Sequence, residues 1–270
     1  MIGQDKLDDR FSKLFRKWSE EDPPPQPQPA LPVDPFYWLD STFRQTQTER
    51  PTVLACIDLV VLAFFFLLRV GEYIASSPAQ QRKKRTVPLR KQDLRFWEGD
   101  RMIDIEAPDL IDRATAVSMS LANQKNGSRG DWISHTSTGH PSFCPVKAAA
   151  RRMDHLRGLP PDTRLCTIRM PNGSYKELRP KAVKPLIQMA SLAVGLTEDK
   201  GYDNNRIGSH SIRASGAMAL KLQGVDDTLI QKLGRWSSDT YKRYIRPQIA
   251  GLTAGLSTLM TVRLSFHQVT

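Results

Sequence analysis

The chain has 270 residues, of which 40% are hydrophobic and 25% are charged. This composition is that of a globular protein with enough residues to bury a sizeable core. Three cysteines exclude a disulfide-stapled scaffold. The longest apolar stretch, residues 59–68, is about half as long as a membrane-spanning helix, so it predicts a buried core helix.

The positive charge is unevenly distributed along the chain. Residues 1–50 contain 7 basic and 9 acidic side chains, whereas residues 51–270 contain 32 basic and 19 acidic ones, a net charge of +13. Such an excess predicts a polyanionic partner, with nucleic acid first and an anionic membrane surface second. A merely basic surface is the alternative that charge alone leaves open.

The N-terminal region is polar and of mixed charge, which is not the pattern of a signal peptide. Residues 7–20 could form a short helix. Seven prolines then fall between positions 23 and 35, a composition typical of an extended linker or tail. We therefore expect the packed domain to begin near Pro35 or Ser41.

The middle of the chain predicts a buried helix followed by strands. Residues from Pro51 to about Val70 are aliphatic on all sides of a helix. The alternation over 93–107 predicts strands, and residues 117–136 predict two more strands around an Asn126-Gly127 turn. A further extended piece is expected within 164–170.

The remaining predicted helices have start and stop signals in the sequence. Ser209 and Asp226 are N-cap residues, and Gly224, Gly234 and Pro247 are stop signals. The predicted helices span 144–158, 179–194, 209–222, 226–234, 237–245 (from Ser237 or Ser238) and an amphipathic stretch over 251–264. The chain is therefore expected to have an α+β fold, mostly helical with a small antiparallel sheet.

The segment HSIR, residues 210–213, combines two side chains suited to phosphate chemistry. His210 and Arg213 are three positions apart, so a helix places them on one face. Arginine offers a planar fork to phosphate oxygens, and histidine transfers protons near neutral pH. Alone, this pattern arises often by chance and is more often a surface His and Arg.

Residues elsewhere in the chain complete a known pattern. Arg69 and Glu72 in RVGEY, Lys125 in the hairpin turn, HSIR, Trp236 and finally Tyr244 occur in this order. The order resembles the catalytic signature of the tyrosine recombinase/integrase superfamily, over residues 50–250. GRWSSDTYKRYIR and CPVKAAARRM look most like the eukaryotic transposon branch, with its Crypton-type and DIRS-like elements.

The resemblance implies a DNA strand-transfer reaction that needs no metal and no cofactor. Tyr244 would attack a scissile phosphate to form a 3′-phosphotyrosyl bond, which conserves the energy needed for religation. Lys125 would act as the general acid on the 5′ oxygen, and His210 would assist as the base. Tyr241 is a rival nucleophile, and Lys147 is a rival acid.

Four further residues have roles implied by the same resemblance. Arg69 and Arg213 would clamp the negative charge of the transition state. Trp236 could donate its indole N–H to a phosphate oxygen or serve as a core aromatic. Glu72 would orient the catalytic groups.

Other basic residues are candidates for contacting double-stranded DNA: Arg82, Lys83, Lys84, Arg85, Arg129, Arg235, Lys242 and Arg243. The cluster at 82–85 could instead be a nuclear import signal or a solvated loop. Nuclear localisation is expected from this cluster and from the resemblance. The resemblance also implies self-association as a dimer or tetramer on DNA. No membrane association is expected.

The expected organisation is a tail with a proline-rich linker over residues 1–45, a catalytic domain over 46–250 and a docking tail over 251–270. Relatives carry a helical domain ahead of the catalytic one, so weak DNA affinity is expected here. A DNA-binding module that does not cut and a topoisomerase-like enzyme are the rival functions. A helical scaffold would leave the net charge of +13 unexplained.

Overall fold

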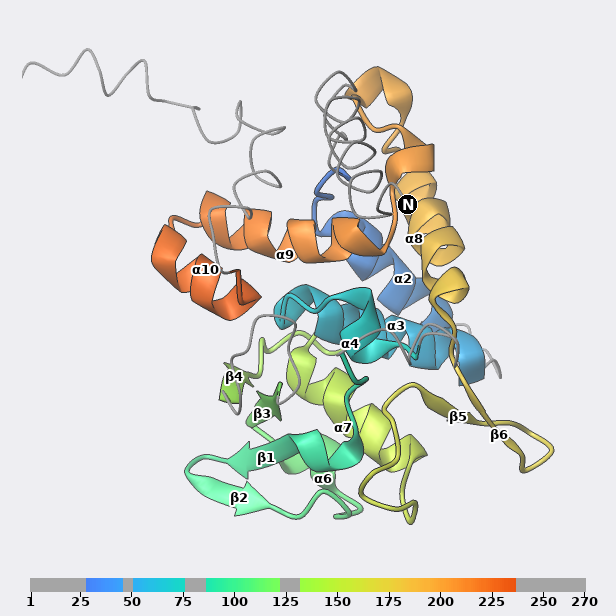
Figure 1. Cartoon of the computed structure of the whole chain (residues 1–270), viewed down its shortest axis with the longest axis vertical. Coiled ribbons are helices and arrows are strands. Elements are labelled where there is room, and N and C mark those ends of the chain that lie inside the picture. Colours follow the sequence, from blue (N-terminus) through green and yellow to red (C-terminus); the bar gives the residue numbers. More distant parts are fainter. Residues whose placement is uncertain (1–27, 46–50, 76–85, 122–131, 237–270) are drawn as a thin grey trace, which may run out of the picture.

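The computed structural model describes residues 28–45, 51–75, 86–121 and 132–236. Within these ranges no helix is long and apolar enough to cross a membrane. The expected α+β class is confirmed, with helices dominating and two small antiparallel sheets (Figure 1). The helices are α2 (Asp34–Gln45), α3 (Pro51–Phe65), α4 (Val70–Tyr73), α6 (Leu110–Arg113), α7 (Pro145–His155), α8 (Val183–Ala193), α9 (Ser209–Leu222) and α10 (Asp227–Gly234). The strands are β1 (Leu94–Glu98), β2 (Arg101–Ile103), β3 (Ala116–Ser120), β4 (Trp132–Thr136), β5 (Thr167–Arg169) and β6 (Tyr175–Glu177).

Helix α3 is the central element of the core. Every residue from Ala55 to Phe64 is buried, and α2, α7 and α9 all pack against the helix. Figure 1 shows α3 between α9 and α7. Gly216 of α9 lies so close to the α3 backbone that an added Cβ would collide with the Phe64 carbonyl. Burying a large aliphatic side chain contributes about 1.5–3 kcal/mol, so α3 organises the fold.

The end of α3 differs from the sequence prediction. The helix was expected to continue to about Val70, but it ends at Phe65. Leu67 adopts a left-handed conformation, with φ of 48°, which a continuous helix does not allow. The separate turn α4 follows, with Arg69 at its N-cap. This break matters because it turns the carbonyls of Phe66 and Leu67 toward other side chains.

The larger sheet has the strand order β2-β1-β3-β4, with every neighbouring pair antiparallel. Phe96, Val117 and Met119 are buried in the main core, where β3 packs against α7. The strands predicted over 93–107 and 117–136 are thereby confirmed. The Asn126-Gly127 turn lies outside the described residues. Strands β5 and β6 form the second sheet, and β5 confirms the extended piece expected within 164–170.

The last part of the segment expected as a tail is helical, and it begins next to Pro35, one of the two starts expected for the packed domain. Residues 34–45 form α2, which packs against α3 and α8. Phe36 and Leu39 are each 1% exposed, and the Phe36 ring lies 4.9 Å from that of Phe64. The apolar residues of DPFYWLDSTF have helical spacing, but they follow directly after the proline-rich stretch. The many prolines led to the prediction of a tail here. The packed domain begins well before residue 46.

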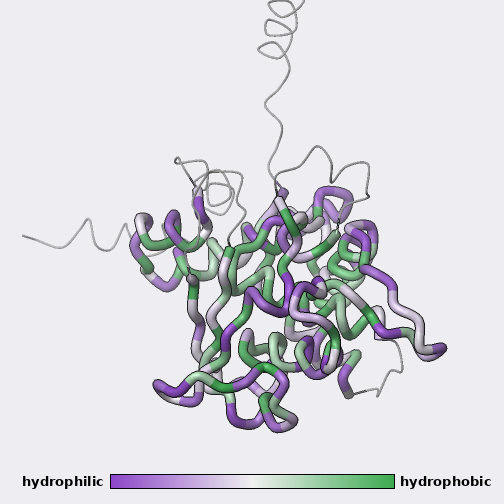
Figure 2. Tube along the Cα trace, turned by 60° about the horizontal axis from the view of Figure 1, so that its bottom comes forward, coloured by the Kyte–Doolittle hydropathy of each residue, from purple (hydrophilic) through white to green (hydrophobic). Residues whose placement is uncertain are grey.

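Helices α9 and α10 match their predicted bounds closely, but Ser209, the predicted N-cap of α9, is its first residue, and Gly208 is the N-cap. Asp226 is the N-cap of α10, where its carboxylate accepts hydrogen bonds from the amides of Thr228 and Leu229. Gly224, with φ of 78°, follows α9 as expected. The helix predicted from Ser237 or Ser238 and the stretch 251–264 lie outside the described residues. Figure 2 shows the hydrophobic segments gathered inside and hydrophilic ones on the loops and hairpin ends.

Candidate active site

Six of the predicted site residues belong to the described part of the chain, and they gather at the C-terminal end of α3: Arg69, Glu72, His210, Arg213, Arg235 and Trp236. The others fall outside the described residues: Arg82, Lys83, Lys84, Arg85, Lys125, Arg129, Lys242, Arg243 and Tyr244, as does the rival nucleophile Tyr241. Lys147, the rival acid, lies in the first turn of α7.

Glu72 is the carboxylate at the centre of this cluster. It is 3% exposed and accepts a hydrogen bond from the Arg69 amide at 2.7 Å and one from Arg69 Nη1 at 3.1 Å. Its Oε2 also accepts from Arg235 Nη2 at 2.9 Å. A buried carboxylate requires such pairing, because desolvation of an unpaired charge is costly. Glu72 therefore fixes the positions of two arginines.

The carbonyls released at the end of α3 hold the other guanidiniums. Leu67 O accepts from Arg213 Nη1 at 2.8 Å and from Arg235 Nη2 at 3.2 Å. Phe66 O accepts from Arg235 Nη1 at 3.0 Å, and Arg213 Nη2 donates to Gly234 O. The last carbonyls of a helix lack partners within it and carry the negative end of its dipole. They therefore suit cationic donors.

Arg235 was expected to contact DNA, but it lies inside the protein at 7% exposure. It has a left-handed conformation, with φ of 55°, at the C-cap of α10. This turn directs its side chain back toward the Phe66 and Leu67 carbonyls. In the structure Arg235 joins α10 to the residues that follow α3. The basic residues near it in the sequence did not indicate this buried role.

Trp236 packs against Arg213. Its ring lies 4.2 Å from the guanidinium carbon of Arg213. Such a placement of a cation over an aromatic ring is an attractive cation–π contact. Arg213 is itself 2% exposed. Helices α9 and α10 therefore meet through this pair, and Trp236 follows directly on the cap at Arg235.

His210 and Arg69 form the accessible side of the cluster. His210 is exposed in the first turn of α9, and the Arg69 side chain is 24% exposed. Desolvation lowers the pKa of His210, and the positive charges of Arg213 and Arg69 lower it further. At neutral pH the imidazole is therefore uncharged and able to accept a proton. An anion bound at this side of the cluster would meet the positive charge of Arg69 and, beside it, the neutral imidazole of His210.

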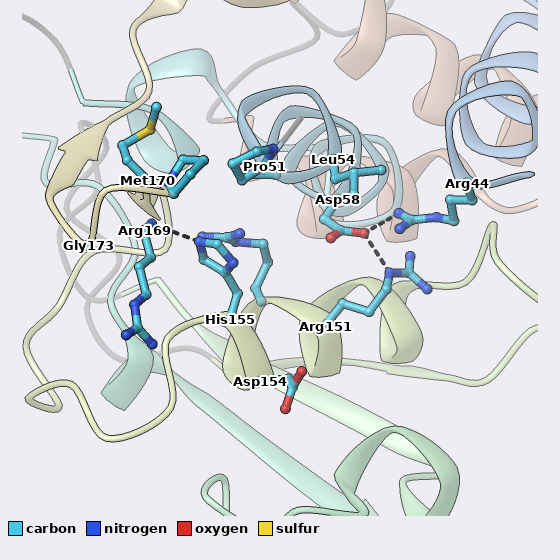
Figure 3. Close-up of a pocket in the computed structure, with 13 residues that line it drawn as sticks. Arg44, Pro51, Leu54, Asp58, Arg151, Asp154, His155, Arg169, Met170 and Gly173 are labelled. Atoms are coloured by element: carbon cyan, nitrogen blue, oxygen red, sulfur yellow. Dashed lines mark hydrogen bonds and ion pairs between the residues drawn. The ribbon is translucent and has the colours of Figure 1, made fainter. Parts of the chain in front are cut away.

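A second arginine cluster lies beside the N-terminal half of α3, around a cavity of 680 Å³ (Figure 3). There Asp58 accepts hydrogen bonds from Arg44 Nη2 and from Arg151 Nε at 2.8 Å. Arg152 donates to the carbonyls of Leu165 and Thr167. None of the predicted site residues that the structure describes lines this cavity. Its arginines tie α2, α3, α7 and β5 together.

Comparison with known proteins places the fold. No protein-family model matches the chain, and no curated protein matches it. Among solved structures, XerH site-specific recombinase bound to palindromic difH substrate, in a post-cleavage complex, matches with a TM-score of 0.52 and 14% identity. That match covers 86% of this chain and 54% of the XerH chain. A pre-cleavage XerH complex with difH substrate matches with a TM-score of 0.52 and 13% identity, over 88% and 55% of the two chains.

The chain has the fold of the tyrosine recombinase catalytic domain. It spans about half the length of the XerH chains. The Tn1549 transposon integrase in complex with transposon right-end DNA has a TM-score of 0.46 and 14% identity, over 89% of this chain and 69% of its own. The Crypton-type or DIRS-like assignment stays a prediction from the sequence.

One residue at the site had no signal in the sequence. Gln28 lies within the proline-rich stretch that was interpreted as a linker, yet its side chain contacts the first turn of α9 beside His210. Its partner amides are 182 and 183 positions away. A single glutamine carries no periodicity or motif, so only the tertiary structure reveals this contact.

Proposed function

We propose that this chain breaks and rejoins double-stranded DNA through a 3′-phosphotyrosyl intermediate, as a tyrosine recombinase. The observation that carries the proposal is the convergence of Arg69, His210 and Arg213 at one end of α3, from segments far apart in the sequence. The fold match supports the same reaction class. The net charge of +13 over residues 51–270 supports a polyanionic substrate.

In the proposed reaction the phenol oxygen of Tyr244 attacks the scissile phosphorus. A tyrosyl O–P bond forms as the P–O5′ bond breaks, and the phenol proton passes to His210. Lys125 gives a proton to the departing 5′ oxygen. Attack by that 5′-hydroxyl on the phosphotyrosine reverses each step, so religation consumes no nucleotide.

The described residues supply the electrostatic part of this reaction. Arg69 is the accessible guanidinium, so it would bind a non-bridging phosphate oxygen directly. Arg213 is buried and held by the Leu67 and Gly234 carbonyls, and it would add positive charge from inside the protein. Removing one such preorganised donor typically costs 10²–10³-fold in rate. The lowered pKa of His210 fits a proton acceptor.

Covalent trapping tests the proposal. Wild type and Tyr244→Phe would be incubated with nicked duplexes, both from the flanks of the gene and from a pool with randomised cores, and resolved on denaturing gels. We expect a protein–DNA adduct in the wild type that Tyr244→Phe abolishes. If Tyr241→Phe abolished the adduct instead, the nucleophile would be Tyr241, one helical turn earlier in the sequence. Binding to DNA with no adduct from any duplex would favour the rival function, a DNA-binding module that does not cut.

A further inference from the structure

We propose that Gln28 is a positioning residue for the base His210, acting through the first turn of α9. Gln28 Oε1 accepts hydrogen bonds from the His210 amide at 3.1 Å and from the Ser211 amide at 3.2 Å. The first amides of a helix have no partner within it. A side chain from outside the catalytic helix therefore caps the turn that carries the proposed base. The inference deepens the proposed function and rests on it.

The local sequence of α9 explains why an external cap is needed. Gly208 occupies the N-cap position, so the chain has no side chain there to accept the first amides. Ser211 instead uses its hydroxyl to accept from the Gly208 amide, at 3.2 Å. A Cβ on Gly208 would come within 3.1 Å of Gln28 Oε1. The glycine therefore leaves the space that the glutamine side chain fills.

The segment that carries Gln28 is anchored along α9 at a second point. The Leu31 amide donates to Ser215 Oγ at 2.7 Å, and Ala30 and Leu31 are 1% and 3% exposed. Contacts at Ser211 and Ser215 are one helical turn apart, so residues 28–31 run beside the helix. This docking holds the glutamine side chain at the start of α9.

The neutrality of the glutamine matters for His210. The imidazole is faced by the cations Arg213, on its own helix, and Arg69, at the start of α4, and Glu72 and Arg235 complete the charged cluster behind them. An uncharged cap leaves the two cations free to keep the pKa of the imidazole low. A carboxylate in its place would attract the protonated form and raise that pKa.

The test compares Gln28→Ala, Gln28→Glu and a matched control in the full chain. Gln188→Ala is the control, because the Gln188 side-chain amide also bonds to the backbone, donating to the Asn204 carbonyl away from the cluster. The readouts are the pKa of His210 by NMR titration, assigned with His210→Gln, and the rate of adduct formation against pH.

We expect Gln28→Glu to raise the pKa of His210 by about one unit and to move the acid limb of the rate profile by the same amount. Gln28→Ala is expected to slow adduct formation about tenfold, because the base loses its fixed position. Gln188→Ala should leave both quantities unchanged. Melting curves for each variant separate these effects from loss of folded protein.

Two results would overturn the inference. An unchanged pKa of His210 in Gln28→Glu would show that the side chain does not reach the base. A shifted pKa with wild-type adduct rates in Gln28→Ala would show that the contact does not position it. If the wild type forms no adduct, the proposed function fails, and the titration, which needs no DNA, still decides whether Gln28 acts on His210.

Discussion

Two clusters of arginines lie along α3, one beside its N-terminal half and one at its C-terminal end, but the clusters are neutralised differently. In the first, Asp58 at the middle of α3 pairs with Arg44 and Arg151, and Arg44 also pairs with the fully buried Asp40. Burial lowers the pKa of Arg44, but Asp58 and Asp40 outweigh it, so the pKa is raised overall. Two carboxylates thus balance Arg44 and Arg151, whereas the third arginine, Arg152, donates to backbone carbonyls, and burial lowers its pKa to about 10.

The C-terminal end of α3 has the opposite balance. Burial lowers the pKa of Arg235, and Glu72 does not offset burial together with the positive charge of Arg69. Desolvation lowers the pKa of His210, and the positive charges of Arg213 and Arg69 lower it further. Cations that repel one another in this way are stabilised when an anion arrives between them. The two clusters therefore differ in charge balance: Asp58 and Asp40 pair with two arginines of the first cluster, whereas Glu72 is the carboxylate that Arg69 and Arg235 share in the second.

Replacing Glu72 by Gln should have the largest effect. The substitution leaves the Arg69 and Arg235 charges without their carboxylate, in a site where Arg235 is 4% exposed. Breaking a buried pair in this way costs about 3–5 kcal/mol of unfolding free energy. Urea unfolding measures it, and adduct formation should also fall. A loss below about 1 kcal/mol would mean that the carbonyls alone hold the cluster.

The matched change at the other end, Asp58→Asn, should cost less. Arg44 and Arg151 have side chains that are 19% and 18% exposed, so water can solvate them when the carboxylate is removed. We expect a loss of about 2 kcal/mol in unfolding free energy. Adduct formation at a temperature where the variant is folded should match the wild type. Equal loss of activity in both variants would erase the distinction between the ends.

A smaller effect is expected from His155, which lines the N-terminal cavity. Desolvation and then Arg152 lower its pKa to about 4 in the folded protein, against about 6.5 when unfolded. The unfolded chain therefore binds the proton first as pH falls, and stability present above pH 6.5 is lost between about 6.5 and 4. Allowing for partial exposure, the loss by pH 5 is about 1 kcal/mol. His155→Gln should flatten this part of the stability profile, and an unchanged slope would contradict it.

Sequence patterns predicted the elements that depend on local signals. Asp226 and Gly224 mark the ends of α10 and α9 because capping is a property of a few adjacent residues. The break at Leu67 could not be predicted, since its left-handed turn is held by arginines from distant helices. Helix α2 was hidden for a related reason, because its partners are α3 and α8.

The candidate site divides in the same way. The spacing of His210 and Arg213 on one helix was visible, and so was the order of the distant partners in the chain. The burial of Arg235 and the cap from Gln28 depend on contacts across more than 160 positions, which no local pattern encodes.

The central claim is that the C-terminal end of α3 binds the scissile phosphate and the N-terminal end does not. Single-turnover adduct formation by Arg69→Ala and Arg44→Ala, on the duplex that the wild type cleaves, tests it most directly. We predict a loss of about 10²–10³-fold for Arg69→Ala and of less than about threefold for Arg44→Ala, whose partners lie in the structural network. Equal rates in the two variants would contradict the account.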